Sequence, residues 1–419
     1  LEALRLGFRT IAMEYNPVAY LILKATVEFP AKYADSGLFE ETLREAKDMI
    51  GWAREHLAKF YSKNDGYIFA RGIRCPFCKG VIPANGLGTV ITKSERFSGR
   101  FLKITIDKQA RAFTVDTCDE EPEGAWKFIT VRKKGGVFTR CPYCGQEFKY
   151  RGRVETEAGL HPFSLWFTEH YTVLARLIEG LEGLDGLPPD IAEKALELHI
   201  PLVKQVGSTF LPIYGDEKEE KLFLSAVEAL GRRALDLQPY LPMDEIPEES
   251  KWGSTARALG AVKWYALYNP RQLLVLSELS RYVAQRAEKL ASSGGEFGAA
   301  VALYLAFSLS KLADYNTIAT KWQGSAFKTG IGNTMRGEST IDFRNEYCEG
   351  NVVIMDLPWN LEPDVAETAA FTRTQGGILP VLRFLTEQFK GSGLGDRISV
   401  YLADATELSA VLEPGSVDV

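Results

Sequence analysis

The sequence predicts an α/β fold in which the two ends of the chain form parts of one open sheet, with a long insertion between them. Three observations predict this fold. A strand, a tight turn and a helix fill residues 9–29, and a strand ending at Asp404 follows a helix. Between these two parts, the pattern of apolar residues changes from short alternating runs to helical periodicity. We therefore expect four parts: 1–66 and 377–419 from the open sheet, 67–153 as a small β insertion and 154–376 as a mainly helical insertion.

The overall composition indicates a globular protein rather than a disordered or membrane-anchored one. With 419 residues, 46% of them hydrophobic and 25% charged, the chain can bury a sizeable core and lacks the low hydrophobicity of disordered chains. The apolar stretches are shorter than the ~20 residues that span a bilayer, so we expect no membrane anchor. Six cysteines without a secretion signal favour a reducing compartment, and we expect a cytoplasmic protein.

The first part begins with a strand at 9–14, where residues alternate toward apolar. Asn16-Pro17 then supplies a helix N-cap residue and a proline at the first helical position. The helix from Val18 to about Phe29 is apolar almost all round, which indicates packing against a sheet. A second, amphipathic helix is expected at 39–60.

The remaining elements follow from changes in periodicity. In the second part, small strands that form an inserted sheet are expected at 101–106, 128–131 and 136–139. In the third part we expect helical structure at 162–231, a linker at 238–250, a helix begun by Asn269-Pro270 and ended by Ser292–Gly295, a buried helix at 299–312, and irregular structure at 340–360. The last part predicts a helix at 378–389 and a strand at 398–402.

Two Cys-Pro-aromatic-Cys motifs are the strongest local signal. They supply Cys75 and Cys78, then Cys141 and Cys144. A CxxC turn presents two sulfurs on one side, and zinc favours four tetrahedral thiolates, so two such turns complete one structural zinc site. The competing interpretations are a redox motif, since Cys-Pro-Tyr-Cys also occurs in glutaredoxin active sites, and unmetallated packing. Cys118 and Cys348 have no spaced partner and are expected to be unliganded, as are the scattered histidines.

The charge around the cysteines points to a polyanionic partner. Residues 71–153 hold 17 Lys and Arg against 8 Asp and Glu, a formal charge of +9 in a chain of −6. Such an excess attracts phosphates with a salt-dependent affinity, so we expect nucleic acid as a partner. The alternative is that the basic residues only solvate exposed strands; they include Lys93, Arg96, Arg100, Arg132, Lys133 and Lys134.

Two acidic residues end predicted strands of the open sheet. In open α/β sheets, ligands bind at the carboxyl ends of the strands, and an acidic residue after the second strand accepts hydrogen bonds from ribose hydroxyls. Glu14 stands in that position. Asp404 ends another strand, where a carboxylate can accept a hydrogen bond from an adenine amino group.

Short motifs spread along the chain resemble the adenine-specific DNA methylases that contain a zinc ribbon. Besides the two cysteine motifs, the resemblance rests on Leu-Glu-Ala-Leu-Arg-Leu-Gly at 1–7, Asn-Pro-Val-Ala at 16–19 with Leu-Ile-Leu-Lys at 21–24, Asn-Pro-Arg-Gln-Leu-Leu at 269–274, Lys-Leu-Ala-Asp-Tyr-Asn at 311–316 and Ala-Asp-Ala-Thr-Glu-Leu at 403–408. The resemblance implies a Rossmann-like methyltransferase sheet that carries the insertion. It also implies methyl transfer from S-adenosylmethionine to an exocyclic base amine, with adenine expected, on a base flipped out of the DNA stack.

Within this resemblance, Glu14, Asn16 and Asp404 are the cofactor-binding candidates. No catalytic residue is assigned, because the family's glycine-rich loop is expected before Leu1 and its Asp-Pro-Pro-Tyr motif after Val419. We therefore expect an internal fragment that is inactive by itself. Asp356–Trp359 resembles the catalytic motif, but its order relative to Asp404 is wrong. A restriction or defence role fits this class.

A second hypothesis assigns the chain a different class of function. In it, the cysteine motifs and helices form a non-catalytic module that binds nucleic acid or assembles with other proteins, and the strand and helix at 9–29 are a vestige. Affinity for the cofactor separates the two hypotheses. Neither predicts an oligomeric state.

Overall fold

The computed structural model describes residues 2–152, 159–249, 254–335, 341–354, 358–361, 377–404, 406, 412–413 and 415–416. Its helices are α1 Glu2–Arg5, α2 Pro17–Leu23, α3 Phe29–Tyr33, α4 Leu38–Leu57, α5 Pro162–Glu179, α6 Pro189–Leu198, α7 Glu217–Arg232, α8 Ala234–Leu237, α9 Ser254–Ala258, α10 Pro270–Asp314 and α11 Ile378–Phe389. Its strands are β1 Thr10–Glu14, β2 Gly66–Arg74, β3 Val81–Ala84, β4 Phe101–Asp107, β5 Ala112–Cys118, β6 Thr130–Lys133, β7 Gly136–Arg140, β8 Glu147–Arg151, β9 His199–Val206, β10 Thr209–Pro212, β11 Lys321–Gly324, β12 Thr329–Gly332, β13 Glu346–Gly350 and β14 Ile398–Leu402.

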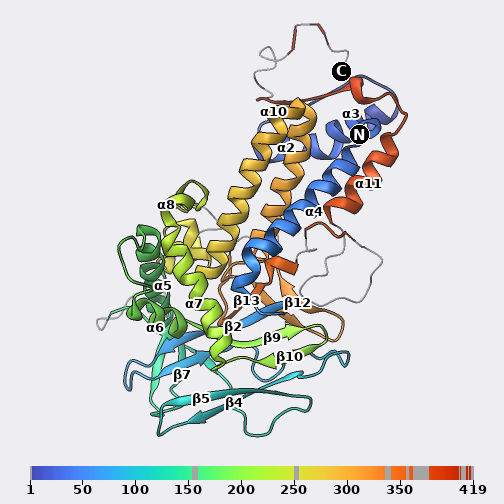
Figure 1. Cartoon of the computed structure of the whole chain (residues 1–419). Coiled ribbons are helices and arrows are strands. Elements are labelled where there is room, and N and C mark those ends of the chain that lie inside the picture. The colour runs from blue at the N-terminus through green and yellow to red at the C-terminus, as the bar shows by residue number, and fades with distance from the viewer. Residues whose placement is uncertain are drawn as a thin grey trace.

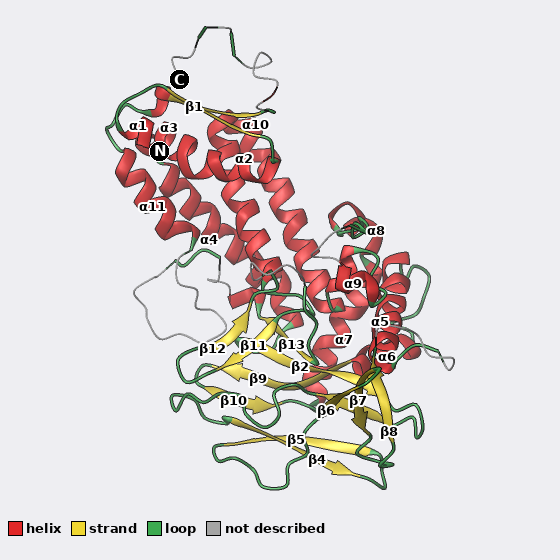
Figure 2. Ribbon diagram, turned by 180° about the vertical axis from the view of Figure 1, so that it is seen from behind, coloured by secondary structure: helices red, strands yellow, loops and turns green. Residues whose placement is uncertain are grey.

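The molecule is mixed α/β, with its larger sheets at one end and a helical bundle leading away from them (Figure 1). The central sheet has the order β10-β9-β2-β13, and β3 pairs with β2. One face of this sheet packs on helices. The other face encloses a second core, with Ile68, Leu102 and Trp322, together with the hairpins β4–β5 and β11–β12. The sheets thus form a half-barrel (Figure 2), and the side chains of this second core fill its interior.

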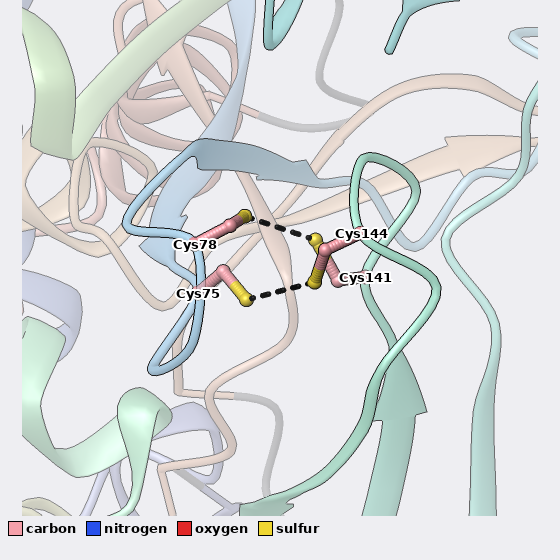
Figure 3. A group of neighbouring side chains, drawn as sticks. All are labelled: Cys75, Cys78, Cys141 and Cys144. Carbon is pink, nitrogen blue, oxygen red and sulfur yellow. Dashed lines mark hydrogen bonds between the residues drawn. The ribbon is translucent and has the colours of Figure 1, made fainter.

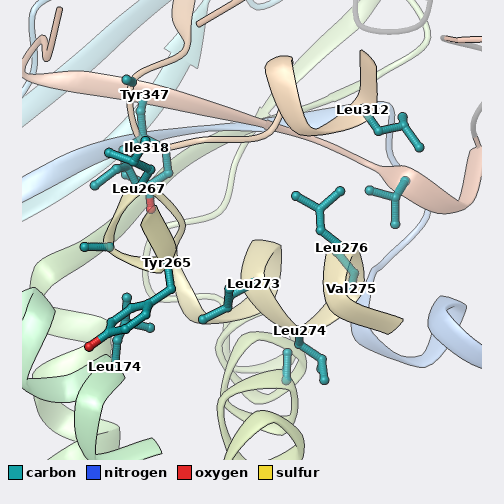
Figure 4. Packing of buried hydrophobic residues seen from close by; sticks show 14 of the residues in the cluster. Leu174, Tyr265, Leu267, Leu273, Leu274, Val275, Leu276, Leu312, Ile318 and Tyr347 are labelled. Atoms are coloured by element: carbon teal, nitrogen blue, oxygen red, sulfur yellow. The ribbon is translucent and has the colours of Figure 1, made fainter. Parts of the chain in front are cut away.

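Helix α10 is the longest helix of the bundle. Asn269 and Gln272 form a capping box at its start, with the Gln272 N–H donating to Asn269 Oδ1 at 2.8 Å. At Gly295 the chain adopts φ 57° and ψ −133°, so the helix folds back into two arms. This turn confirms the predicted helix end. The first arm packs Leu273, Leu274 and Val275 into the main core (Figure 4), and α10 contacts α4 and α7.

By length and apolar composition, α10 is also the one helix among the described residues that could cross a membrane. The indication is weak, because a core helix of a soluble protein passes the same test. The expectation of a protein without a membrane anchor, and its cytoplasmic location, stay predictions.

At the end of the bundle away from the half-barrel, β1 and β14 form a two-stranded parallel sheet near both chain termini (Figure 2). Thr10 pairs with Ile398 and Glu14 pairs with Leu402. A small core lies against the sheet, with Leu4, Val27, Phe389 and Val400 buried in it. The two ends of the chain are therefore adjacent strands of one sheet, as the sequence predicts.

Most of the predicted local elements are confirmed. They are the strand at 9–14, the helix at 39–60, the strands at 101–106 and 136–139, the helix at 378–389 and the strand at 398–402. The first helix continues from Pro17 through a π-helical turn at Lys24–Glu28 to Tyr33. The expectation that it packs all along its length is only half right, because α2 contains no buried residue.

Three local predictions are wrong, and each error concerns a strand. Helical periodicity was expected throughout 162–231, but β9 and β10 form a hairpin there, turning at Gly207 with φ 58°. The segment 340–360 was expected to be irregular, yet β13 lies beside β2. The strand expected at 128–131 begins at Thr130, and the small strands of the second part lie in three sheets rather than one.

Candidate functional site

The two cysteine motifs are the loops of two hairpins with the same backbone geometry. One loop joins β2 to β3, and the other joins β7 to β8. In the first, Cys75 N–H donates to Gly80 O at 2.9 Å; in the second, Cys141 N–H donates to Gln146 O at 2.9 Å. The fifth residue of each loop has a positive φ, 63° at Lys79 and 75° at Gly145.

These loops bring the four predicted cysteines together (Figure 3). Cys75 Sγ lies 3.9 Å from Cys144 Sγ, and Cys78 Sγ lies 3.7 Å from Cys141 Sγ. All four sulfurs lie within 4.8 Å of one another, and all four thiols are free. Among the described residues this is the one group of histidine, cysteine or acidic side chains arranged to hold a metal ion.

The two loops pack on each other through an aromatic side chain. A Cβ at Gly80 would lie 2.7 Å from the Tyr143 ring, so only glycine fits there. The Tyr143 hydroxyl donates to Val81 O at 2.6 Å. Phe77 occupies the equivalent position of the first loop, but its side chain is 57% exposed. The loops are therefore held in register by contacts that do not depend on the sulfurs.

The protonation of the thiols reflects their burial. Burial raises the pKa of Cys75 and Cys141. Burial acts in the same direction at Cys78, but hydrogen bonds from the Gly80 backbone and from the other thiols outweigh it and leave its pKa lowered. A bound cation would offset the cost of four clustered thiolates. The surroundings do not match a thiol oxidoreductase, because both cysteine pairs lie between antiparallel strands rather than between a strand and a helix.

The predicted cofactor-binding residues lie at one edge of the β1–β14 sheet. Since the strands are parallel, Glu14, the last residue of β1, and Asp404, two residues past the end of β14, lie at the same end of the sheet, and Ala403 N–H donates to Glu14 O at 3.2 Å. Glu14 Oε1 accepts a 3.1 Å hydrogen bond from Asn16 N–H. Asn16 Oδ1 caps α2 by accepting from Val18 N–H at 2.9 Å, so this residue has a structural role at the edge.

Asp404 is ordered by the residues that follow it. Its Oδ1 accepts hydrogen bonds from the Thr406 backbone N–H at 2.8 Å and the Thr406 hydroxyl at 2.7 Å. These bonds lower the pKa of the Asp404 carboxyl below its ordinary value. Residues 417–419, where apolar and polar residues alternate and a strand is expected to begin, lie outside the described residues, as does Asp356 of the Asp356–Trp359 stretch.

A buried polar network was missed by the sequence analysis. His199 Nε2 lies 3.2 Å from His170 Nδ1, and His199 Nδ1 lies 2.8 Å from the Tyr347 hydroxyl. His170 Nε2 lies 3.1 Å from Ala266 O, so the four groups form a chain. Burial lowers the pKa of His170 to about 3 and lowers that of His199 well below its ordinary value. No sequence spacing indicates this pair, because a strand and a helix bring it together.

An ion pair extends this network. Arg271 Nε donates to Glu349 Oε1 at 2.6 Å, and Asn269 Nδ2 donates to Glu349 Oε2 at 2.7 Å, with all three residues buried. These groups join the start of α10 to β13. They hold the helix against the sheet and do not form a metal site.

Comparison of the chain with protein-family models, with curated proteins and with solved structures gives no match.

Proposed function

We propose that the chain is part of an S-adenosylmethionine-dependent DNA amino-methyltransferase that carries a structural zinc ion. One observation supports this proposal most: the parallel pairing of β1 and β14, which places Glu14 and Asp404 at one carboxyl edge. In doubly wound sheets, ligands bind outside the carboxyl ends of the strands. The edge is thus in the right place for a nucleoside group with ribose and adenine donors.

The order of the strands also supports the proposal. In the 3-2-1 order of a Rossmann-like sheet, the second and third strands are neighbours and the third lies outermost. β1 and β14 correspond to the second and third strands. Consistent with an outermost β14, its Val400 N–H donates to the buried Glu28 carboxylate at 3.1 Å rather than to another strand. β1 has one strand partner among the described residues, and its other edge is where a first strand would pair.

The cysteine cluster fits zinc by size and donor chemistry. Four thiolates at a Zn–S distance of ~2.3 Å would be ~3.8 Å apart in a tetrahedron. Two of the six sulfur separations, 3.7 and 3.9 Å across the two loops, agree with that spacing, and all four sulfurs lie within 4.8 Å of one another. Zinc would then join β2 and β3 to β7 and β8 as a ribbon-like unit, and its role would be structural, because four protein ligands leave no open position.

In this proposal the residues of the chain bind and orient the reactants. Glu14 would accept hydrogen bonds from the ribose hydroxyls, and Asp404, whose carboxyl pKa is lowered by its Thr406 contacts, would accept from the adenine amino group. The cofactor supplies the methyl group. The group that accepts the target amine's protons belongs to the Asp-Pro-Pro-Tyr motif that the resemblance places on another strand. Residues 71–153, which carry the two cysteine motifs and a formal charge of +9, attract the DNA phosphates.

Cofactor affinity tests the proposal. In the protein expressed from its complete natural reading frame, Glu14→Gln and Asp404→Asn are each expected to weaken S-adenosylhomocysteine binding about tenfold, because each removes a charged hydrogen-bond acceptor. Isothermal titration calorimetry measures this affinity. Glu40→Gln, an exposed carboxylate on α4, is the matched control. If the unaltered protein binds DNA but not S-adenosylhomocysteine, the enzyme proposal fails. The hypothesis of a non-catalytic module that binds nucleic acid is then the better supported one.

The DNA partner is tested at the β6–β7 hairpin. Arg132 and Lys134 are exposed there, while Lys133 is paired with Glu147 at 2.5 Å. Replacing Arg132 and Lys134 together by Gln is expected to weaken DNA binding and to lower the slope of log affinity against log salt by about 2, since each phosphate contact contributes about 0.9. Fluorescence anisotropy across salt concentrations measures both. Lys218→Gln with Lys221→Gln on α7 is the charge-matched control, and an unchanged slope in the hairpin variant would exclude this contact.

A further inference from the structure

The tip of the β11–β12 hairpin presents a phenylalanine entirely to solvent. Phe327 is 102% exposed, more than any other large apolar side chain among the described residues. The loop that carries it is well ordered by hydrogen bonds. Ser325 N–H donates to Lys328 O at 3.0 Å, and Lys328 N–H donates to Ser325 Oγ at 2.9 Å. The ring is thus held away from the surface instead of folding back onto it.

The stem of this hairpin is firmly attached to the half-barrel. Trp322 Nε1 donates to Ile91 O at 2.6 Å, and the hydroxyls of Thr92 and Thr329 lie 2.6 Å apart. A Cβ at Gly324 would lie 2.1 Å from Ile91 O, which shows how closely the hairpin packs on the preceding loop. Because the stem is rigid and the aromatic ring at its tip is unpacked, the ring can press against a partner without any rearrangement of the core.

The surroundings of the tip are cationic. Lys328 is the next residue of the loop, and Lys93, whose N–H donates to Gly324 O at 3.0 Å, lies at the base of the hairpin. Arg96 follows in the same loop as Lys93. All three side chains are exposed and form no ion pair with the residues that the structure describes, while the exposed Glu95 lies between Lys93 and Arg96 in the chain. The exposed ring is therefore adjacent in the chain to the Lys328 cation, and the Lys93 cation belongs to the loop on which the stem packs.

We propose that Phe327 is a wedge that enters between adjacent base pairs of duplex DNA, with Lys328 and Lys93 at the flanking phosphates. The proposal rests on DNA being the partner in the proposed function and adds how the duplex is deformed. An apolar side chain that unstacks a base step, combined with cations that contact the backbone, is a known way for proteins to kink DNA. A membrane is less well matched, because a single ring between Ala326 and Lys328 lacks the broad apolar face of interfacial segments.

Replacing the ring tests the wedge. Phe327→Ala is expected to weaken binding to a duplex about tenfold, since stacking on a base contributes about 1–3 kcal/mol. It should also abolish the fluorescence increase of 2-aminopurine placed at the unstacked step, while the salt slope stays unchanged. Phe327→Leu, which keeps an apolar wedge, is expected to retain most of both signals. Lys328→Gln should instead lower the salt slope by about 1 and keep the 2-aminopurine signal.

Controls separate this inference from the proposed function. Phe384→Ala removes a 59% exposed ring on α11 and should leave DNA binding unaltered. S-adenosylhomocysteine affinity should be the same in all these variants. Duplex binding that is equal in Phe327→Ala and the unaltered protein would overturn the wedge alone. Absence of any duplex binding at low salt would overturn both the wedge and the DNA partner, and Phe327-dependent binding to anionic vesicles in place of DNA would assign the tip to a membrane.

Discussion

Replacing Cys141 by Ser is expected to remove one zinc ion per chain and to lower the free energy of unfolding by about 5 kcal/mol or more. Cys141 is buried, and its sulfur lies 3.7 Å from that of Cys78, so its loss opens the cluster at its centre. The two hairpin loops would then retain only their direct packing, chiefly the Tyr143 contact with Gly80. The effect is expected to be large because a zinc ion bound to these loops would add its binding free energy to the stability of the folded state.

Elemental analysis and thermal unfolding measure this result together. Cys118→Ser is the matched control, since Cys118 is partly exposed and lies outside the cluster. A chelator should destabilise the unaltered protein and the Cys118 variant equally, and should have little further effect on the Cys141 variant. Full zinc content and unchanged stability in Cys141→Ser would contradict the site.

Acidification from pH 7 to 5.5 is expected to destabilise the protein through the buried histidine pair. Burial holds the pKa of His170 at about 3 and that of His199 well below its ordinary value, so the folded protein keeps both rings neutral. The unfolded chain binds these two protons near pH 6.5. The stability is therefore complete above that pH and is lost as the pH falls from 6.5 toward the folded pKa values, by about 1.4 kcal/mol per pH unit for each histidine.

Urea unfolding at several pH values between 7 and 5.5 measures this slope. The double variant His170→Gln with His199→Gln is expected to be less stable at pH 7 but to lose the histidine-dependent slope. His56→Gln alters an exposed ring that stacks on Trp52 and should keep the slope. A pH-independent free energy of unfolding over this range in the unaltered protein would show that the pair is already charged in the folded state.

The cysteine cluster illustrates why some features can be predicted locally. The spacing Cys-x-x-Cys, a proline and a following glycine are sufficient to predict a loop that presents two sulfurs, and two copies predict one site. The sequence could not show which aromatic of the two loops is buried. Tyr143 covers the first loop while Phe77 remains exposed, because the loops pack asymmetrically and that asymmetry arises only when the hairpins meet.

The sequence by itself determined the local elements, because capping and amphipathic periodicity act within a few residues. These elements are the helix caps, the helix at 378–389 and the strands at both ends of the chain. The tertiary structure alone decided the strands β9 and β13, whose residues become strands by pairing with β2 across long separations. It also decided the contact of His170 with His199 and the exposure of Phe327. These features depend on long-range pairing and on which surfaces other elements cover, and no local pattern of side chains encodes either.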